Sequence, residues 1–155
     1  MIAGDYYSGK LVNRTYNAVH MEFHSSSDHT IKLDRKEVEI QIYMKSKDPY
    51  QDYTYGVLAI LFDVYKDSKY ELPKFWNKVI TGLKDKTKTT TNPVINMWTD
   101  FGDDMNAKML WDDLYSYKGS STIPPCNENV FWFVCRETMS ITQDQLDILR
   151  GWNPE

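Results

Sequence analysis

The sequence has little of what marks several large classes of protein. No hydrophobic run approaches the roughly 20 residues that a membrane-spanning helix needs, and residues 1–5 do not have the pattern of a signal peptide. The formal net charge is −4, with acidic and basic residues interleaved, so the chain lacks the basic surface of a nucleic-acid-binding protein. We therefore expect no membrane span and no nucleic-acid partner.

Motifs for several enzyme classes are absent as well. There is no Ser-His-Asp arrangement, no glycine-rich phosphate loop and no paired-cysteine metal motif. What the chain does have is 41% hydrophobic and 14% aromatic content, with eleven tyrosines and five tryptophans, a composition that favours β-sheet. Its 155 residues predict one β-dominated domain, residues 1–155.

Local patterns predict where the strands and helices lie. The expected strands are residues 16–24, residues 37–45, Gly56–Phe62 and Val130–Cys135. Helical spacing predicts a helix over Leu72–Leu83, and a capping box over Thr142–Gln145 opens a second, short helix. The segment Gly4–Lys10 is predicted to be a turn-rich entry to the first of these strands.

Polar side chains alternate along the first two predicted strands. Because successive side chains of a strand point to opposite faces, His20, Glu22 and His24 share one face. In the next strand Gln41 and Tyr43 lie on one face in the same way. Two such strands side by side would form the floor of a polar pocket.

Three blocks, taken in order, resemble the signature of the α-carbonic anhydrases. They are Tyr16-x-x-x-His20-x-Glu22-Phe23-His24-x-x-Ser27-Asp28-His29-Thr30, then Glu39-x-Gln41, then Gly119-Ser-Ser-Thr122-Ile-Pro-Pro-Cys126. The resemblance implies a mainly β (α+β) fold, a large twisted and mostly antiparallel sheet with a few short peripheral helices. It covers about Gly4 to Arg150 and lacks counterparts of the family's N-terminal part and closing strands. We expect either a fragment of a longer product or a trimmed domain completed by other chains.

The departures from the family pattern concern its zinc site. Three histidines hold the catalytic zinc in the family, and their positions here are Glu22, His24 and Gln41. A neutral amide is a poor zinc ligand, and glutamate differs from histidine in charge and reach. The resemblance therefore implies vestigial metal positions, no bound metal, no functional catalytic residue and no cofactor.

The residues around that site match the family pattern more closely than the three zinc-ligand positions do. Thr122 stands at the family's gatekeeping threonine, Asp28 at the carboxylate that orients it, and His29 and Glu39 at a pair that supports the zinc ligands. Tyr43 stands where the family has a small apolar residue in its carbon dioxide pocket, which a bulky ring would fill. The possible pocket residues are His20, Tyr43 and Ile123.

These observations favour a catalytically inactive carbonic anhydrase-like protein, a structural or interaction subunit of a larger assembly. Other protein chains would cover its open sheet edges. The alternative is a metal-dependent carbonate dehydratase with a rearranged zinc site on His20, Glu22 and His24, although residues i and i+4 of a strand lie roughly 13 Å apart. A third interpretation gives the vacated pocket to a small anion or peptide, with Thr122 and His24 as donors.

Two features of the sequence bear on the cellular compartment of the protein. Cys126 stands where secreted members of the family form a disulfide with a cysteine whose region is absent here, and Asn13-Arg14-Thr15 is a glycosylation sequon. A secretory origin is compatible with both features. The favoured interpretation of Cys126 and Cys135 is two free, buried thiols.

Overall fold

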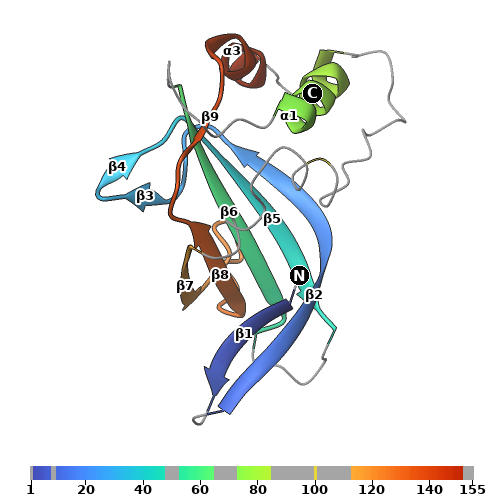
Figure 1. The fold of residues 1–155 in the computed structure, drawn as a ribbon, viewed down its shortest axis with the longest axis vertical. Coiled ribbons are helices and arrows are strands. Elements are labelled where there is room, and N and C mark those ends of the chain that lie inside the picture. Colours follow the sequence, from blue (N-terminus) through green and yellow to red (C-terminus); the bar gives the residue numbers. More distant parts are fainter. Residues whose placement is uncertain are drawn as a thin grey trace.

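A mixed β-sheet dominates the computed structural model, which describes residues 2–7, 10–47, 53–64, 73–84, 100 and 113–151. The strands are β1 (Ile2–Tyr7), β2 (Lys10–His24), β3 (Thr30–Ile31), β4 (Asp34–Arg35), β5 (Val38–Ser46), β6 (Tyr55–Asp63), β7 (Leu114–Gly119), β8 (Val130–Cys135) and β9 (Met139–Ser140). The helices are α1 (Pro73–Lys84) and α3 (Gln143–Gly151). The predicted fold class, a mainly β architecture with short helices outside the sheet, is confirmed (Figure 1).

The sheet runs in the order β1-β2-β5-β6-β8-β7, and β9 also pairs with β6. Strands β1, β2, β5 and β6 form an antiparallel series, whereas β8 and β9 lie parallel to β6. Residues 56–62 of β6 and all of β8 are buried, as continuous apolar runs predict for strands covered on both faces. These two strands are the centre of the core.

Each face of the sheet has its own apolar cluster. On one face, side chains of β5 and β6 such as Ile40 and Ile60 pack with Phe75 and Trp76 of α1 and Leu146 of α3. The other face has a smaller cluster, made by Tyr43, Val57, Ala59, Leu61, Val130, Trp132 and Val134. Both helices lie at one end of the sheet, as Figure 1 shows. The second face carries the polar residues discussed below.

Both helices match their sequence patterns. Helix α1 spans Pro73–Lys84, with Leu72 outside the described residues. At the start of α3, Thr142 N donates to Gln145 Oε1 (3.0 Å) and Gln145 N donates to Thr142 Oγ1 (3.2 Å), so the predicted capping box is confirmed. None of the described helices is long and apolar enough to cross a membrane.

Two local predictions are wrong. Strand β1 occupies Ile2–Tyr7, where a turn-rich entry was expected, and it pairs with β2 from Ile2↔Thr15 to Tyr7↔Lys10. Both cysteines are free, but only Cys135 is buried and Cys126 is exposed. Cys126 follows the Pro-Pro pair and has a φ of 56°.

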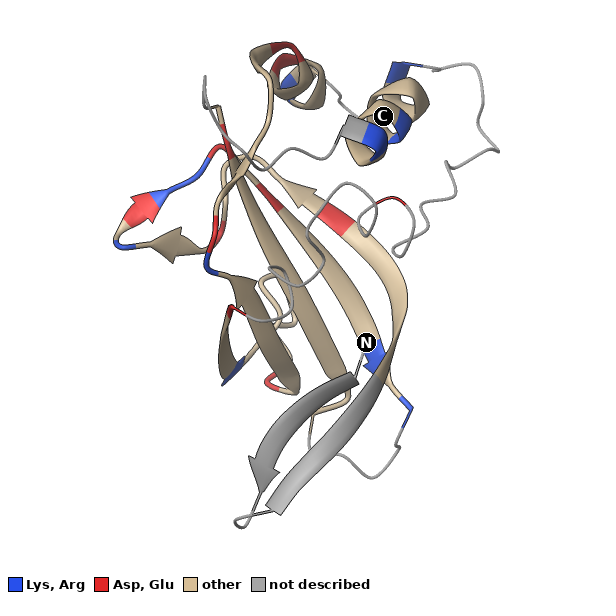
Figure 2. Cartoon of the chain, in the orientation of Figure 1, with Lys and Arg blue, Asp and Glu red and all other residues tan. Residues whose placement is uncertain are grey.

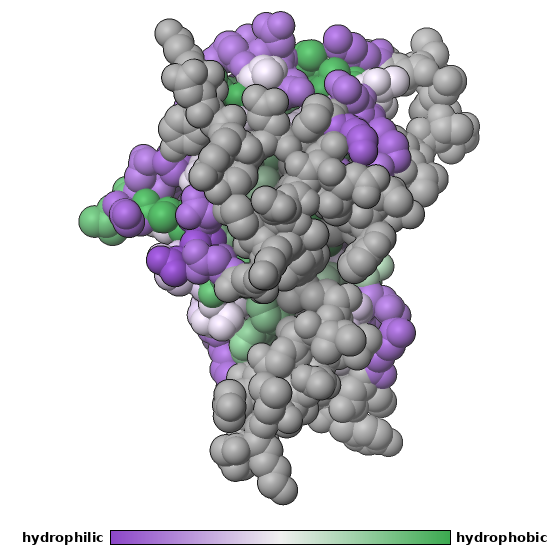
Figure 3. Space-filling view, viewed as in Figure 1, coloured by the Kyte–Doolittle hydropathy of each residue, from purple (hydrophilic) through white to green (hydrophobic). Residues whose placement is uncertain are grey.

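Among the described residues, many of the charged ones lie at strand ends, on the helices and on the β3–β4 hairpin (Figure 2). The hairpin projects from the body and is tied to it by Ser27, whose N donates to Lys36 O (2.9 Å) and whose Oγ accepts from Lys36 N (2.9 Å). Its tip residue Leu33 is 97% exposed. In Figure 3 hydrophobic atoms therefore lie at the tip among hydrophilic ones.

Candidate functional site

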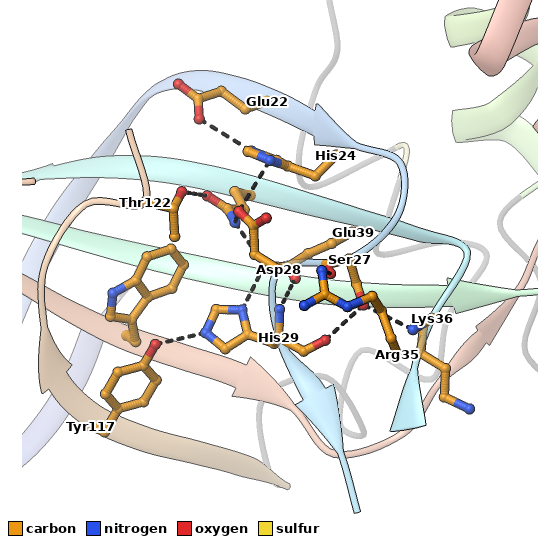
Figure 4. A network of polar contacts seen from close by, with 12 residues as sticks. Glu22, His24, Ser27, Asp28, His29, Arg35, Lys36, Glu39, Tyr117 and Thr122 are labelled. Carbon is orange, nitrogen blue, oxygen red and sulfur yellow. Dashed lines mark hydrogen bonds and ion pairs between the residues drawn. The ribbon is translucent and has the colours of Figure 1, made fainter. Parts of the chain in front are cut away.

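The polar face of β2 and β5 assembles as the alternation predicts. The two strands are antiparallel with the pairs His20↔Tyr43, Glu22↔Gln41 and His24↔Glu39. A register shift between Ala18 and His20 precedes these pairs, so residues 20–24 themselves run in regular register. The candidate residues of both strands thus come together on one surface, as Figure 4 shows for several of them.

Gln41 is fully buried and lies at the centre of this surface. Its Nε2 donates to Asp28 Oδ2 (3.1 Å) and to Glu39 Oε1 (2.9 Å). Its Oε1 accepts from the Tyr43 hydroxyl (3.2 Å) and from Thr122 Oγ1 (3.4 Å). An ionised carboxylate can accept hydrogen bonds but cannot donate them. Asp28 and Glu39 therefore orient the amide nitrogen of Gln41 toward themselves, and the amide oxygen faces the hydroxyl groups of Tyr43 and Thr122.

Beside Gln41, a buried carboxylate supports a histidine and a tyrosine. Glu39 accepts from His29 N (2.8 Å) and from His29 Nδ1 (2.7 Å), and His29 Nε2 lies 2.7 Å from the Tyr117 hydroxyl. With the imidazole proton on Nδ1, Nε2 accepts from Tyr117. The expected pairing of His29 with Glu39 is therefore present, and Tyr117 extends it.

The pKa values of Glu39 and Tyr117, on either side of His29, shift in opposite directions. Burial alone would raise the pKa of Glu39, but the hydrogen bonds from His29 and from the amide of Gln41, aided by the charge of His29 whenever that ring is protonated, hold it below its ordinary 4.5. Burial, aided by the negative charge of Glu39, raises the pKa of Tyr117 to about 12. The carboxylate is thus ionised and the phenol neutral at pH 7.

Asp28 and Thr122 approach Gln41 from opposite ends of its amide. Asp28 Oδ2 lies 3.1 Å from His24 Nδ1 and accepts from Gln41, while Thr122 donates to Gln41 instead of to Asp28. Both residues thus contact Gln41, and the orienting of Thr122 by Asp28 stays a prediction.

Glu22 lies between two histidines. One of its oxygens is 3.1 Å from His20 Nε2 and the other is 3.5 Å from His24 Nε2. The His20 ring also stacks on Tyr43, with centroids 4.6 Å apart and an interplanar angle of 10°. The carboxylate contacts each ring through a different oxygen. This arrangement is that of a polar cluster, whereas two histidines that bind one metal ion would point to a common position.

Tyr43 occupies the space next to this cluster. Tyr43 is 6% exposed, and its ring contacts Trp132 edge-on. Burial, together with the charges of Glu22 and Asp28, raises the pKa of its hydroxyl. Ile123 is 46% exposed, so it lies at the rim of the surface instead of inside it.

The family model for eukaryotic-type carbonic anhydrase matches residues 3–153. The chain belongs to this family. Alpha carbonic anhydrase 4 of Arabidopsis thaliana is 29% identical over 145 residues, which cover 92% of this chain and 49% of the plant protein. The chain thus spans about half the length of that carbonic anhydrase.

A receptor phosphatase and a carbonic anhydrase of known structure are also similar to this chain. The receptor-type tyrosine-protein phosphatase zeta of Rattus norvegicus is 26% identical over 164 residues, 95% of this chain but 7% of the phosphatase. The crystal structure of a halotolerant carbonic anhydrase from Dunaliella salina has a TM-score of 0.69 at 20% identity and covers 91% of this chain and 52% of the other. This last likeness concerns the fold.

Carbonic anhydrases use zinc, and the residues at the ligand positions of this chain do not fit a catalytic zinc. Of the three, only Glu22 and His24 have a buried polar atom without a hydrogen bond, because both ends of the Gln41 amide are engaged. A catalytic zinc needs three protein ligands and an open fourth position. Among the described residues no group of three or more His, Cys, Asp or Glu side chains is placed to hold a metal ion.

Sequence reasoning did not identify two residues of the site. Tyr117 was not singled out, and Trp132 was predicted only as part of the buried strand Val130–Cys135. In the structure the Trp132 ring lies edge-on to His29 (4.8 Å between centroids), stacks on Tyr117 and donates from Nε1 to Ser120 O (3.0 Å). Tyr117 pairs with Trp132 across β7 and β8. Predicting both residues would have required knowing that these two strands are neighbours.

Proposed function

We propose that the chain is a catalytically inactive carbonic anhydrase fold that acts as a structural or interaction subunit of a larger assembly. The observation that carries the proposal is Gln41, whose amide is hydrogen-bonded through both its nitrogen and its oxygen. Hydration by a zinc enzyme depends on a metal-bound water with lowered pKa. With an engaged neutral amide at one ligand position and a carboxylate at another, these residues are poorly suited to that chemistry.

Tyr43 supports the same proposal from the substrate side. In active family members the corresponding small apolar residue leaves room for carbon dioxide, whereas Tyr43 places a buried phenol ring between His20 and Trp132. A polar hydroxyl also points at Gln41. The engaged amide of Gln41 and the buried ring of Tyr43 thus both support the proposal.

The strands at the edges of the sheet support the proposed interaction role. Among the described strands, β1 and β7 stand at the two ends of the order, and the side chains of residues 115–118 in β7 are exposed. An edge strand presents unpaired backbone groups that favour pairing with another chain. Another protein chain along β7 is therefore the partner that we propose.

The test of inactivity is zinc content and carbon dioxide hydration, measured on the same sample by elemental analysis and stopped flow. We expect substoichiometric zinc and no hydration above the buffer rate. The matched control is the double variant Glu22→His with Gln41→His, which restores three histidines and should acquire zinc. One equivalent of zinc together with hydration in the natural protein would favour the rearranged metal site and contradict the proposal.

The subunit role needs a separate measurement. Native mass spectrometry of the protein isolated from its source should detect it bound to another polypeptide. A monomer under these conditions, with no partner on crosslinking, would leave the fold without the assembly role.

A further inference from the structure

Strand β7 lies at one edge of the sheet and pairs only with β8 among the described strands (Figure 1). The pairing is regular and antiparallel from Leu114↔Cys135 to Gly119↔Val130. One contact just before the strand fixes the phase of its hydrogen bonds. Arg136 N donates to Asp113 O (3.2 Å), so these two residues form a hydrogen-bonded pair.

This phase decides which backbone groups of β7 face outward. Hydrogen-bonded pairs recur at every second residue of an antiparallel ladder. The backbone N–H and C=O groups of Tyr115 and Tyr117 therefore point at β8. Those of Leu114, Ser116 and Lys118 point away from it, toward the open side of the strand. The outward groups are thus spaced symmetrically about Ser116.

A symmetric set of outward groups can pair with the same strand of a second copy of the chain. In an antiparallel pair about a two-fold axis one residue lies opposite itself, because facing side chains share one face of the sheet. With Ser116 on the axis, Leu114 and Lys118 pair with each other across the axis, and about six backbone hydrogen bonds form. Tyr115 then lies opposite Tyr117 of the copy, on both sides of the axis.

The competing register within the described strand has Tyr117 on the axis. It sets Tyr115 opposite Gly119 and forms only about four backbone hydrogen bonds. It also leaves a single tyrosine pair across the strands, and aromatic pairs are among the contacts that stabilise neighbouring strands. The register centred on Ser116 is therefore the better one.

The side chains of β7 suit the Ser116-centred register. Tyr115 and Tyr117 are 45% and 43% exposed. Both rings are already held by β8 and the residue after it, since Trp132 stacks on Tyr117 with an interplanar angle of 8° and the guanidinium of Arg136 lies 5.2 Å from the Tyr115 ring centroid. Rings held in this way lose little freedom on binding. On the other face Lys118 meets a leucine, so like charges do not oppose each other.

We propose that the partner of β7 is a second copy of this chain, paired antiparallel about a two-fold axis at Ser116, so that the two sheets join edge to edge. The inference rests on the proposed function, because it names the partner of an interaction subunit. An edge-to-edge contact buries little surface compared with a permanent dimer. We therefore expect a dimer that dissociates on dilution.

The first experiment is sedimentation velocity of the purified chain over a range of concentrations. Ser116 is exposed and would lie opposite itself, so Ser116→Lys and Ser116→Glu each set like charges face to face. We expect each variant to raise the dissociation constant of the dimer at least tenfold, and an equimolar mixture of the two to restore the natural affinity. The control Val19→Lys adds the same charge at a 58% exposed position of β2, and should leave the affinity unchanged.

Three results would overturn the inference. The first is a chain that stays monomeric at every concentration. The second is a mixture of the two charged variants that associates no more tightly than either alone. The third is tighter association of Ser116→Glu by itself, which is the result expected of the Tyr117-centred register, where residue 116 faces Lys118 of the copy.

A second measurement needs no variant. The amides of Ser116 and Lys118 should exchange with deuterium more slowly above the dissociation constant than below it, while those of β6 stay unchanged, as NMR can follow residue by residue. Exchange of these amides that does not depend on concentration would overturn the inference. A monomeric chain found bound to a different polypeptide would also overturn it but leave the assembly role intact, whereas hydration activity would contradict only the proposed inactivity.

Discussion

At the scale of single residues, Glu39 links the site to stability. Its side chain is fully buried and accepts three hydrogen bonds, two from His29 and one from Gln41. Because the folded protein holds the pKa of Glu39 below 4.5, the ionised carboxylate favours the folded state. This contribution is complete above pH 4.5 and is lost as the pH falls from there through the folded pKa.

Replacing Glu39 with Gln should therefore lower the free energy of unfolding by about 2 kcal/mol at pH 7, the range for hydrogen bonds to a charged group. The change should also flatten the loss of stability below pH 4.5. Urea unfolding at a series of pH values from 3 to 7 measures both effects. A variant that keeps the full acid dependence would place the titrating group elsewhere.

The matched control is Tyr117→Phe, which removes only the outer hydrogen bond to His29. We expect it to cost about 1 kcal/mol and to leave the acid dependence unchanged, because Tyr117 does not contact the carboxylate.

Most residues of the candidate site, Tyr117 and Trp132 excepted, were singled out from the sequence, but their contacts were not predicted. Motif spacing selected Glu22, His24 and Gln41, and the alternation of strands placed them on one surface. It could not give the direction of the Gln41 amide, because that depends on Asp28 and Thr122, which arrive from two separate loops.

At the scale of elements, the β3–β4 hairpin has an unusual turn. Lys32 and Leu33 form its two-residue loop with φ of 53° and 66°. Two positive values are typical of the type I′ turn, which favours Asn and Gly. A leucine in this conformation is strained, and at 97% exposure it gains nothing from packing.

Leu33→Gly should therefore stabilise the protein, by about 1 kcal/mol, because glycine adopts positive φ without the clash of a Cβ atom. Leu33→Ala keeps that atom and should give no gain. Thermal and urea unfolding of the pair measure the difference. Equal stabilities of the two variants would show that the turn is not strained.

The elements that sequence patterns predicted best are the buried ones. The apolar run at Val130–Cys135 gave β8 with the same bounds, since a strand covered on both faces has few polar residues to interrupt it. Strand β7 was not predicted, because its residues 115–118 are exposed and their pattern depends on pairing with β8. The hairpin was missed because Lys-Leu is not a turn sequence.

At the scale of the whole molecule, protection should decrease from the centre of the sheet to its ends. Strand β6 pairs with β5 on one side and with β8 and β9 on the other. Its amides should exchange with deuterium most slowly, and those of β7 much faster, because β7 pairs only with β8 among the described strands.

Hydrogen–deuterium exchange with mass spectrometry tests this gradient on the isolated chain. In the proposed assembly, β7 should become protected while β6 changes little. Equal protection of β6 and β7 in the isolated chain would mean that the β7 edge is already covered, and would remove the argument for a partner there.

The parallel pairing of β6 with β8 also sets an order for folding. Strands β2, β5 and β6 follow one another closely in the chain, whereas β6 ends at Asp63 and β8 begins at Val130. Closing so long a loop costs more entropy than forming the local pairs, so distant pairing is the slower event. We expect His24, Glu39 and Gln41 to come together in an early three-stranded intermediate, and Thr122 and Tyr117 to reach them only when β8 docks.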